Sequence, residues 1–228
     1  MPKGKPEFIP NQVFVGLPWK NVRARYEKVI GRLENKFPLY FTIVGRDDGQ
    51  SAEDLLEIIK QRVTTSSFAI FDATGGNANV SLEYGYAEGV EVPRAIYLST
   101  HKAAQQTAGS PIISDLGGKR RIQYKTETGL SAALHKFCSE HDYTLRFERA
   151  LVKVLSGYAK GKKKRMRTLA IKLVHTLDGR NEVRRAEVIQ KLQAQGYKDT
   201  EVEFMLKHLH AHGVILCTVG RSSKVRVA

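Results

Sequence analysis

The first 142 residues alternate between short apolar runs and amphipathic segments, and this alternation most constrains the fold. The apolar runs, rich in β-branched and aromatic side chains, predict β-strands at residues 12–17, 39–45, 67–73, 94–100 and 121–126. The intervening segments repeat apolar side chains along one helix face, at residues 21–37, 51–63, 79–90 and 129–142. Strands alternating with helices form a parallel sheet covered on both faces. We therefore expect a flavodoxin-like or Rossmann-like α/β domain over residues 1–150.

The loop after the third predicted strand carries the clearest chemical signal. In sheets of this kind, ligands bind beyond the carboxyl ends of the strands. The segment "DATGGNANVSLEYGYAEG" starts with Asp72 at the strand end, and Gly75 lets the backbone turn sharply beside a ligand. Asn77 and Asn79 offer amides to a ligand or a cap to the next helix. Glu83 is expected on the first turn of that helix, so that Asp72 and Glu83 converge on a space suited to a sugar or nucleotide.

The C-terminal third differs from the rest in both charge and pattern. The chain carries a net charge of +14, and residues 151–228 hold 17 Lys and Arg against 6 Asp and Glu. Three short amphipathic segments end at glycines, and two apolar runs around "RSS" predict a hairpin. Three helices followed by a hairpin are typical of a winged helix-turn-helix, which we expect as a small α+β domain over residues 151–228.

Composition limits the other classes of function. No apolar run reaches the roughly 20 residues that span a bilayer, and the N-terminus lacks the apolar core of a secretory signal. Cys138 and Cys217 follow no metal or redox spacing, which favours a cytoplasmic location. The triplet His208, His210 and His212 has no nearby Cys, Asp or Glu to complete a zinc set. We expect neither a metal nor a cofactor.

The segment from Asp72 to Gly89 resembles nucleoside 2-deoxyribosyltransferases and the related TIR-like nucleotide hydrolases. In these proteins, a strand that ends in an acid leads into a helix with a Glu-x-Gly-x-Ala pattern, here Glu83 to Ala87. "VFVGLPW" is similar to their first strand and ligand loop, and residues 113–134 to their last strand and helix. The resemblance covers residues 11 to 138.

The resemblance implies a role for several residues. Glu83 takes the position of the catalytic carboxylate, which faces the sugar carbon that becomes positively charged as the base departs. Asp72 matches an acid that contacts the leaving base or a sugar hydroxyl. The remaining substrate-binding candidates are Gly16, Trp19, Arg46, Gly75, Asn77, Asn79 and Tyr86. Where transferases commonly have a second acid, this loop has Asn77 and Asn79, which favours a hydrolase or a binding module.

The basic third predicts contact with a polyanion, although winged helices also serve as protein-interaction modules. Phosphate contacts are expected from lysines and arginines of its first helix, second helix and wing. These nucleic-acid-binding candidates are Lys162, Lys163, Lys164, Arg165, Arg167, Arg184, Arg185, Arg221, Lys224 and Arg226. The third helix opens with Asp199, Glu201 and Glu203, which disfavours base readout in a DNA groove.

Two functions follow from these observations. The first is an N-glycosidase-type enzyme that cleaves the base–sugar bond of a nucleoside, nucleotide or NAD-like dinucleotide, with a C-terminal module for nucleic acid or a protein partner. Because TIR-like domains joined to a second module are frequent in prokaryotic antiphage defence, the resemblance also implies a defence effector. The alternative is a nucleotide-sensing DNA-binding regulator with a non-catalytic pocket. Related domains assemble as dimers or larger, so a homo-oligomer is expected in either case.

Overall fold

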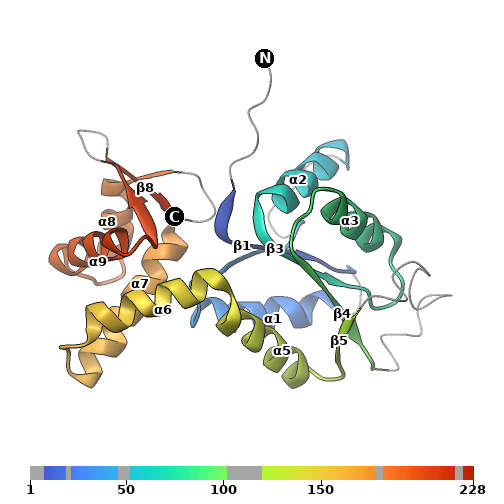
Figure 1. Ribbon diagram of the computed structural model, residues 1–228, viewed down its shortest axis with the longest axis horizontal. Helices are drawn as coiled ribbons and strands as arrows, with labels where there is room; N and C mark the ends of the chain where they lie inside the picture. The colour runs from blue at the N-terminus through green and yellow to red at the C-terminus, as the bar shows by residue number, and fades with distance from the viewer. Residues whose placement is uncertain (1–7, 19–21, 46–51, 102–119, 178–181, 219–222) are drawn as a thin grey trace, which may run out of the picture. The chain divides into compact units, whose positions relative to one another are not determined.

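The computed structural model describes residues 8–18, 22–45, 52–101, 120–177, 182–218 and 223–228 (Figure 1). The chain divides into two compact units. The α/β unit holds residues 12–32 and 41–137, and the C-terminal unit holds residues 138–228 together with residues 9–11 and 33–40. No helix in the described ranges is long and apolar enough to cross a membrane.

The α/β unit alternates strands and helices as the sequence predicted. Its sheet is parallel, with the strand order β2-β1-β3-β4-β5 of flavodoxin-like folds. In chain order the elements are β1 (Ile9–Gly16), α1 (Arg23–Glu34), β2 (Tyr40–Thr42), α2 (Ala52–Thr65), β3 (Ser66–Asp72), α3 (Ala78–Gly89), β4 (Arg94–Ser99), β5 (Arg121–Tyr124) and α5 (Glu127–Glu140). Between β1 and β3 the strand order reverses direction, which is where ligands bind in open α/β sheets.

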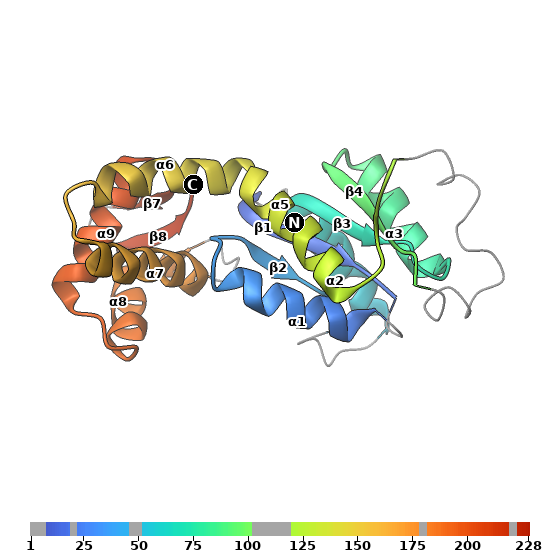
Figure 2. The same ribbon diagram turned by 90° about the horizontal axis from the view of Figure 1, so that it is seen from below.

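Helices cover both faces of this sheet. Figure 1 shows α2 and α3 on one side of the strands and α1 and α5 on the other; Figure 2 shows α1 and α5 from below. On the α2–α3 face, Phe71 of β3 packs against Phe14 of β1 and Tyr84 of α3, with ring centroids 5.8 and 5.5 Å apart. Side chains of adjacent strand residues point to opposite faces, so Asp72 points toward α1 and α5.

The C-terminal unit has the winged-helix topology. Its described residues form four helices and a three-stranded antiparallel sheet of order β6-β8-β7. Its elements are α6 (Asp142–Leu155), α7 (Lys160–Thr176), β6 (Val183–Arg184), α8 (Arg185–Gln193), α9 (Asp199–Ala211), β7 (Ile215–Cys217) and β8 (Lys224–Val227). Gly196 and Gly213 follow α8 and α9 with φ of 85° and 66°, the left-handed conformation that glycine adopts most readily.

Helix α6 was not predicted from the sequence, and the domain boundary expected at residue 150 falls inside it. The C-terminal unit instead begins at Cys138. The reason is that α6 buries one face against the winged helix: Tyr143 donates a hydrogen bond of 3.0 Å to the carbonyl of Val214. Phe147 and Leu151, one and two turns further along, are also buried. The basic run from Lys160 to Arg167 forms the first half of α7.

Candidate active site

A cavity of about 190 Å³ lies in the α/β unit at the carboxyl end of β1. It is lined from the end of β1, from the residues after β2, and from α2 and α3. This is the point where the strand order reverses. A dry cavity of about 150 Å³ holds one benzene-sized ring, so the described space encloses one ring of a ligand and leaves the remainder outside its mouth.

Glu83 is the only acid among the described residues that line this cavity. It lies on the second turn of α3, not the first as expected, because the helix begins at Ala78. Burial raises the pKa of its carboxyl group from 4.5 to about 7. No described residue donates a hydrogen bond to this carboxylate or pairs with it, so the ionised form keeps its charge uncompensated.

Gly16 ends β1 and lets the Glu83 carboxylate approach the backbone. A Cβ placed on Gly16 would stand 2.5 Å from Oε2 of Glu83 and 2.7 Å from Cδ1 of Phe71. Both distances are shorter than van der Waals contact. Residue 16 therefore cannot carry a side chain while the Glu83 carboxylate keeps its present position. The close approach is the structural use of this glycine.

Three further polar residues line the cavity. Asn77 is the N-cap of α3, and its Oδ1 accepts hydrogen bonds from the backbone N–H groups of Asn79 and Val80 at 2.9 and 3.3 Å. Asn79 is exposed and offers its side-chain amide to the cavity. Arg23, at the start of α1, forms an ion pair of 2.8 Å with Glu27. A carboxylate, amides and a guanidinium thus surround an otherwise apolar space.

The structure does not bring Asp72 and Glu83 together. Asp72 is fully buried on the opposite face of the sheet, where Oδ2 accepts a hydrogen bond of 2.6 Å from the Tyr124 hydroxyl and Oδ1 accepts one of 2.9 Å from the Thr74 N–H. Burial raises the pKa of Asp72, against the opposing effect of hydrogen bonds from Thr74 and the tyrosines. The predicted convergence fails because β3 continues through Asp72, so this side chain and Phe71 point to opposite faces.

The other predicted substrate contacts lie in different places. Gly75 and Gly76 turn the chain after β3 with φ of 78° and 63°, and Gly75 is not among the described lining residues. The hydroxyl oxygen of Tyr86 lies 3.2 Å from Oγ1 of Thr64 on α2. Tyr86 is also not among the described lining residues of the cavity. Trp19 and Arg46 lie outside the described residues.

Most of the cavity wall consists of apolar residues that the sequence analysis did not select. Leu56 and Leu82 stand out because they are 44% and 65% exposed while lining the cavity. The signal was available in part, since such loops and helices border the carboxyl ends of β1 and β2. The apolar lining comprises Phe14, Val15, Leu17, Ile43, Val44, Leu55, Leu56, Ile59, Val80 and Leu82.

In the C-terminal unit, several predicted phosphate contacts form ion pairs within the protein. Arg165 pairs with Glu201 and Arg185 with Glu203, which accounts for two of the acids on α9. Arg167 pairs with Glu148, and Lys224 with Glu182. Lys162, Lys163 and Lys164 are exposed on α7, and Arg184 is exposed where α8 begins. Arg226 lies on β8, half-buried, and Arg221 lies outside the described residues.

Comparison of the chain with protein-family models and with curated proteins finds no match. Among solved structures, the chain is similar to a 2-desoxiribosyltransferase from Leishmania mexicana, with a TM-score of 0.44 and 13% sequence identity, over 58% of this chain and 99% of that one. In the described residues, no group of three His, Cys, Asp or Glu side chains is placed to hold a metal ion. The chemistry of the site therefore has to be argued from its own residues.

Proposed function

We propose that the α/β unit cleaves the base–sugar bond of a nucleoside, nucleotide or NAD-like dinucleotide, with Glu83 as the catalytic carboxylate. The observation that carries this proposal is a partly buried acid without a hydrogen-bonding or charged partner among the described residues, in the wall of a cavity at the strand reversal. Keeping a carboxylate in such a place destabilises its ionised form. A charge left uncompensated in the resting protein is available to a cation that develops during a reaction.

Breaking an N-glycosidic bond produces such a cation. The electron pair of the bond leaves with the base, and positive charge develops over the sugar carbon and its ring oxygen. The ionised Glu83 carboxylate stabilises this charge, and a water molecule then forms the new bond to the carbon and releases its proton to the base or to solvent. One well-placed electrostatic group contributes about 3 kcal/mol, roughly a hundredfold in rate.

The absence of a second acid among the described lining residues favours water over a second base as the acceptor of the sugar. Asn77 and Asn79 donate and accept hydrogen bonds but transfer no protons. Arg23 adds guanidinium donors to the wall, although Glu27 pairs with it, and such donors suit a substrate that carries a phosphate. We therefore infer a hydrolase rather than a transferase, and Asp72 is proposed to hold the loop after β3 instead of contacting the substrate.

The test is the release of free base. The full chain is incubated with NAD, nucleosides and nucleoside monophosphates, and products are separated by chromatography. Base release by the wild-type protein, lost in Glu83→Gln, supports the proposal. No release from any substrate by folded protein overturns it.

A nucleotide-sensing regulator is the second candidate, and the winged-helix topology of the C-terminal unit favours it. Here the cavity binds a nucleotide without cleaving it, and occupancy changes the affinity of the C-terminal unit for DNA. Calorimetry with a nucleotide that remains intact, followed by DNA titration with and without it, distinguishes this candidate. An affinity for DNA that the nucleotide leaves unchanged would exclude it.

The expected homo-oligomer is proposed to form through the mouth of the cavity. Leu56 and Leu82 are large apolar side chains left exposed there, and exposed apolar patches mark interaction surfaces. Light scattering on the wild type and on Leu82→Glu tests this proposal. A multimer that Leu82→Glu reduces to a monomer supports it, and a monomeric wild type contradicts it.

The defence role that the resemblance implies rests on this activity. If it is correct, cells that express the wild-type chain resist phage infection in plaque assays and cells that express Glu83→Gln do not. Equal plaque numbers with both proteins would show that the proposed activity does not protect cells from phage.

A further inference from the structure

Helix α9 takes the place of the recognition helix in the winged-helix unit, and it is poorly suited to contact with a polyanion. Its outward side carries Glu203, held by Arg185, and both line a groove between α9 and the β7–β8 hairpin together with Lys207 and His210. Glu201 at the first turn pairs with Arg165. An acid placed in the groove of a DNA-facing helix repels phosphates, so this surface is not where the net charge of the unit acts.

A different surface of the same unit is strongly basic. Helix α7 contains no acidic residue along its 17 positions. Four lysines in its first turns are exposed, and none of them forms an ion pair in the described structure. We call this surface the lysine corner; it comprises Lys160, Lys162, Lys163 and Lys164.

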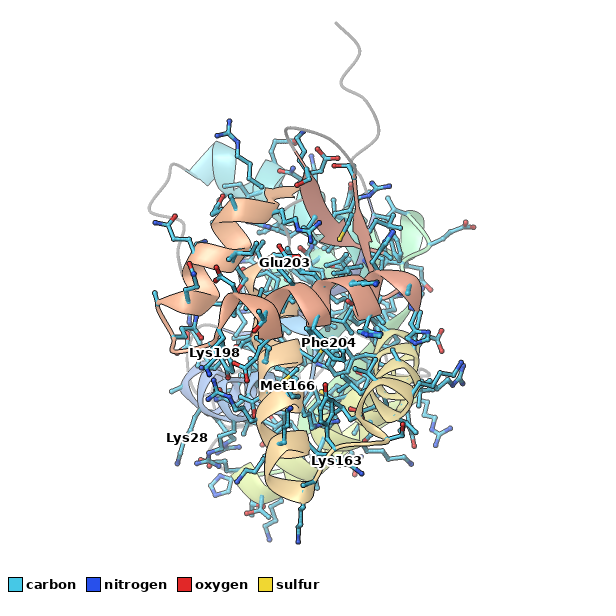
Figure 3. The ribbon with its side chains drawn as sticks, turned by 90° about the vertical axis from the view of Figure 1, so that its left-hand side faces the viewer. Lys28, Lys163, Met166, Lys198, Glu203 and Phe204 are labelled. Carbon is cyan, nitrogen blue, oxygen red and sulfur yellow. The ribbon has the colours of Figure 1, made fainter. Side chains whose placement is uncertain are left out.

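Aromatic rings border the lysine corner. The ammonium group of Lys162 lies 4.4 Å from the ring centroid of Tyr158, which precedes α7. Tyr158 meets Phe204 of α9 edge to face with centroids 6.1 Å apart, and Phe204 lies 4.2 Å from the ring of His208. All three rings are only partly buried. Figure 3 shows Phe204 on the side of α9 toward α7, where Lys163 lies, and Glu203 further from α7; Phe204 and Glu203 also border one groove.

We propose that the lysine corner binds single-stranded nucleic acid, with phosphates on the lysines and a base stacked on Tyr158 or Phe204. Cationic side chains that follow a backbone, combined with exposed aromatic faces, are the features of single-strand binding surfaces. A duplex keeps its bases stacked inside and uses only the charge. The proposal does not depend on any activity at Glu83.

Fluorescence anisotropy with a short labelled single strand and with its duplex, on the full chain, tests the proposal. The single strand is expected to bind more tightly than the duplex. Replacing Lys162, Lys163 and Lys164 together by Gln removes three phosphate contacts, which lowers the slope of log affinity against log salt by about 2. Tyr158→Ala is expected to weaken single-strand binding roughly tenfold, because stacking of one base is lost.

Matched variants make the result decisive. Lys28, Lys125 and Lys191 lie outside α7, and their joint replacement by Gln removes the same net charge; it is expected to leave affinity within about twofold. Thermal unfolding shows that each variant is folded. Equal affinity for duplex and single strand, unchanged binding by Tyr158→Ala, or the same loss in the control triple overturns the proposal. An increase in single-strand affinity on Glu203→Gln would place the site on the recognition helix and also overturn it.

Discussion

Asp72 and Glu83 are both carboxyl groups whose pKa values are raised by loss of solvent, but Asp72 is fully buried and Glu83 only partly, and the two faces of the sheet surround them differently. On the α1–α5 face, Asp72 accepts hydrogen bonds from the Tyr124 hydroxyl and the Thr74 N–H, and no part of it reaches solvent. On the α2–α3 face, Glu83 borders a cavity and accepts no hydrogen bond from a described residue. Loss of solvent raises the pKa of both acids, but only the Glu83 carboxylate lacks a hydrogen-bond donor among the described residues.

The difference gives a rule for the two sites. A buried carboxylate whose oxygens are satisfied stabilises the fold around it, because removing it leaves donors unpaired. A buried carboxylate without partners destabilises the fold when ionised, and it persists where the charge has another use. The two acids therefore should respond to mutation with opposite signs in stability.

The largest expected effect is on Asp72. Asp72→Ala leaves the Tyr124 hydroxyl and the Thr74 N–H without an acceptor in the core, which is expected to lower the free energy of unfolding by about 3 to 5 kcal/mol. Asp72→Asn keeps the shape and an oxygen for Thr74, and its amide donates to the Tyr124 oxygen. Urea denaturation should find Asp72→Asn within about 1 kcal/mol of wild type. Folded Asp72→Asn without base release would show that Asp72 acts in chemistry, and would break the contrast.

Glu83→Gln is expected to lower the rate of base release by roughly a hundredfold, or about 3 kcal/mol. It should also stabilise the protein. The folded pKa of about 7 lies above 4.5, so the stability that protonated Glu83 provides is complete below pH 4.5 and lost as the pH rises to about 7. Above pH 7, the free energy of unfolding of Glu83→Gln should therefore exceed that of the wild type by about 2 to 3 kcal/mol. Its melting temperature should be higher as well. Equal stability of the two proteins at pH 8 contradicts this account.

Gly16→Ala is expected to act on both properties of the Glu83 site. The new methyl group displaces the carboxylate and presses on Phe71, with a loss of about 2 kcal/mol in stability and a fall in activity. Gly85 on the same helix as Glu83 is the matched control, because a Cβ there meets no atom within 4 Å. Gly85→Ala should stabilise α3 by about 0.5 to 1 kcal/mol. If both variants behave alike in thermal unfolding and in activity assays, the close approach of Glu83 to Gly16 contributes neither to stability nor to activity.

The pH dependence of the reaction distinguishes a charge role for Glu83 from a proton-donor role. Because the ionised form is needed, kcat/KM is expected to rise about tenfold per pH unit up to about 7 and then level off. The profile is measured under conditions where the protein stays folded. A rate that falls through pH 7 would mean that Glu83 donates a proton, and the contrast with Asp72 would then need a different basis.

The α/β fold could be predicted from the sequence because short apolar runs alternate with longer helical segments over residues 1–142. Helix α6 was missed because residues 143–150 were assigned to no element and no glycine or proline separates α6 from α5. Only the contacts of Tyr143 and its neighbours show that α6 belongs to the C-terminal unit.

The site was predicted only in part. Gly16, Asn77, Asn79 and Glu83 line one cavity, and this follows from the strand order that the alternating pattern implies. The place of Asp72 depends on the alternation of side chains along β3. The predicted strand 67–73 already contained Asp72, and because Phe71 packs against α3, Asp72 points to the opposite face. No local pattern records on which face of the sheet the helix with Glu83 packs.

The smallest expected effect separates the two asparagines beside Glu83. Asn77→Ala removes the cap of α3 and is expected to lower stability by about 1 kcal/mol, since two N–H groups lose their acceptor. Asn79→Ala removes an exposed amide whose side chain makes no described hydrogen bond, so stability should stay within about 0.5 kcal/mol. If the cavity binds a sugar, Asn79→Ala should instead raise KM by several-fold, because one hydrogen bond to substrate is lost. An Asn79→Ala protein with unchanged KM would restrict the chemistry of this face to Glu83, whereas a stability loss equal to that of Asn77→Ala would assign both asparagines to the helix start.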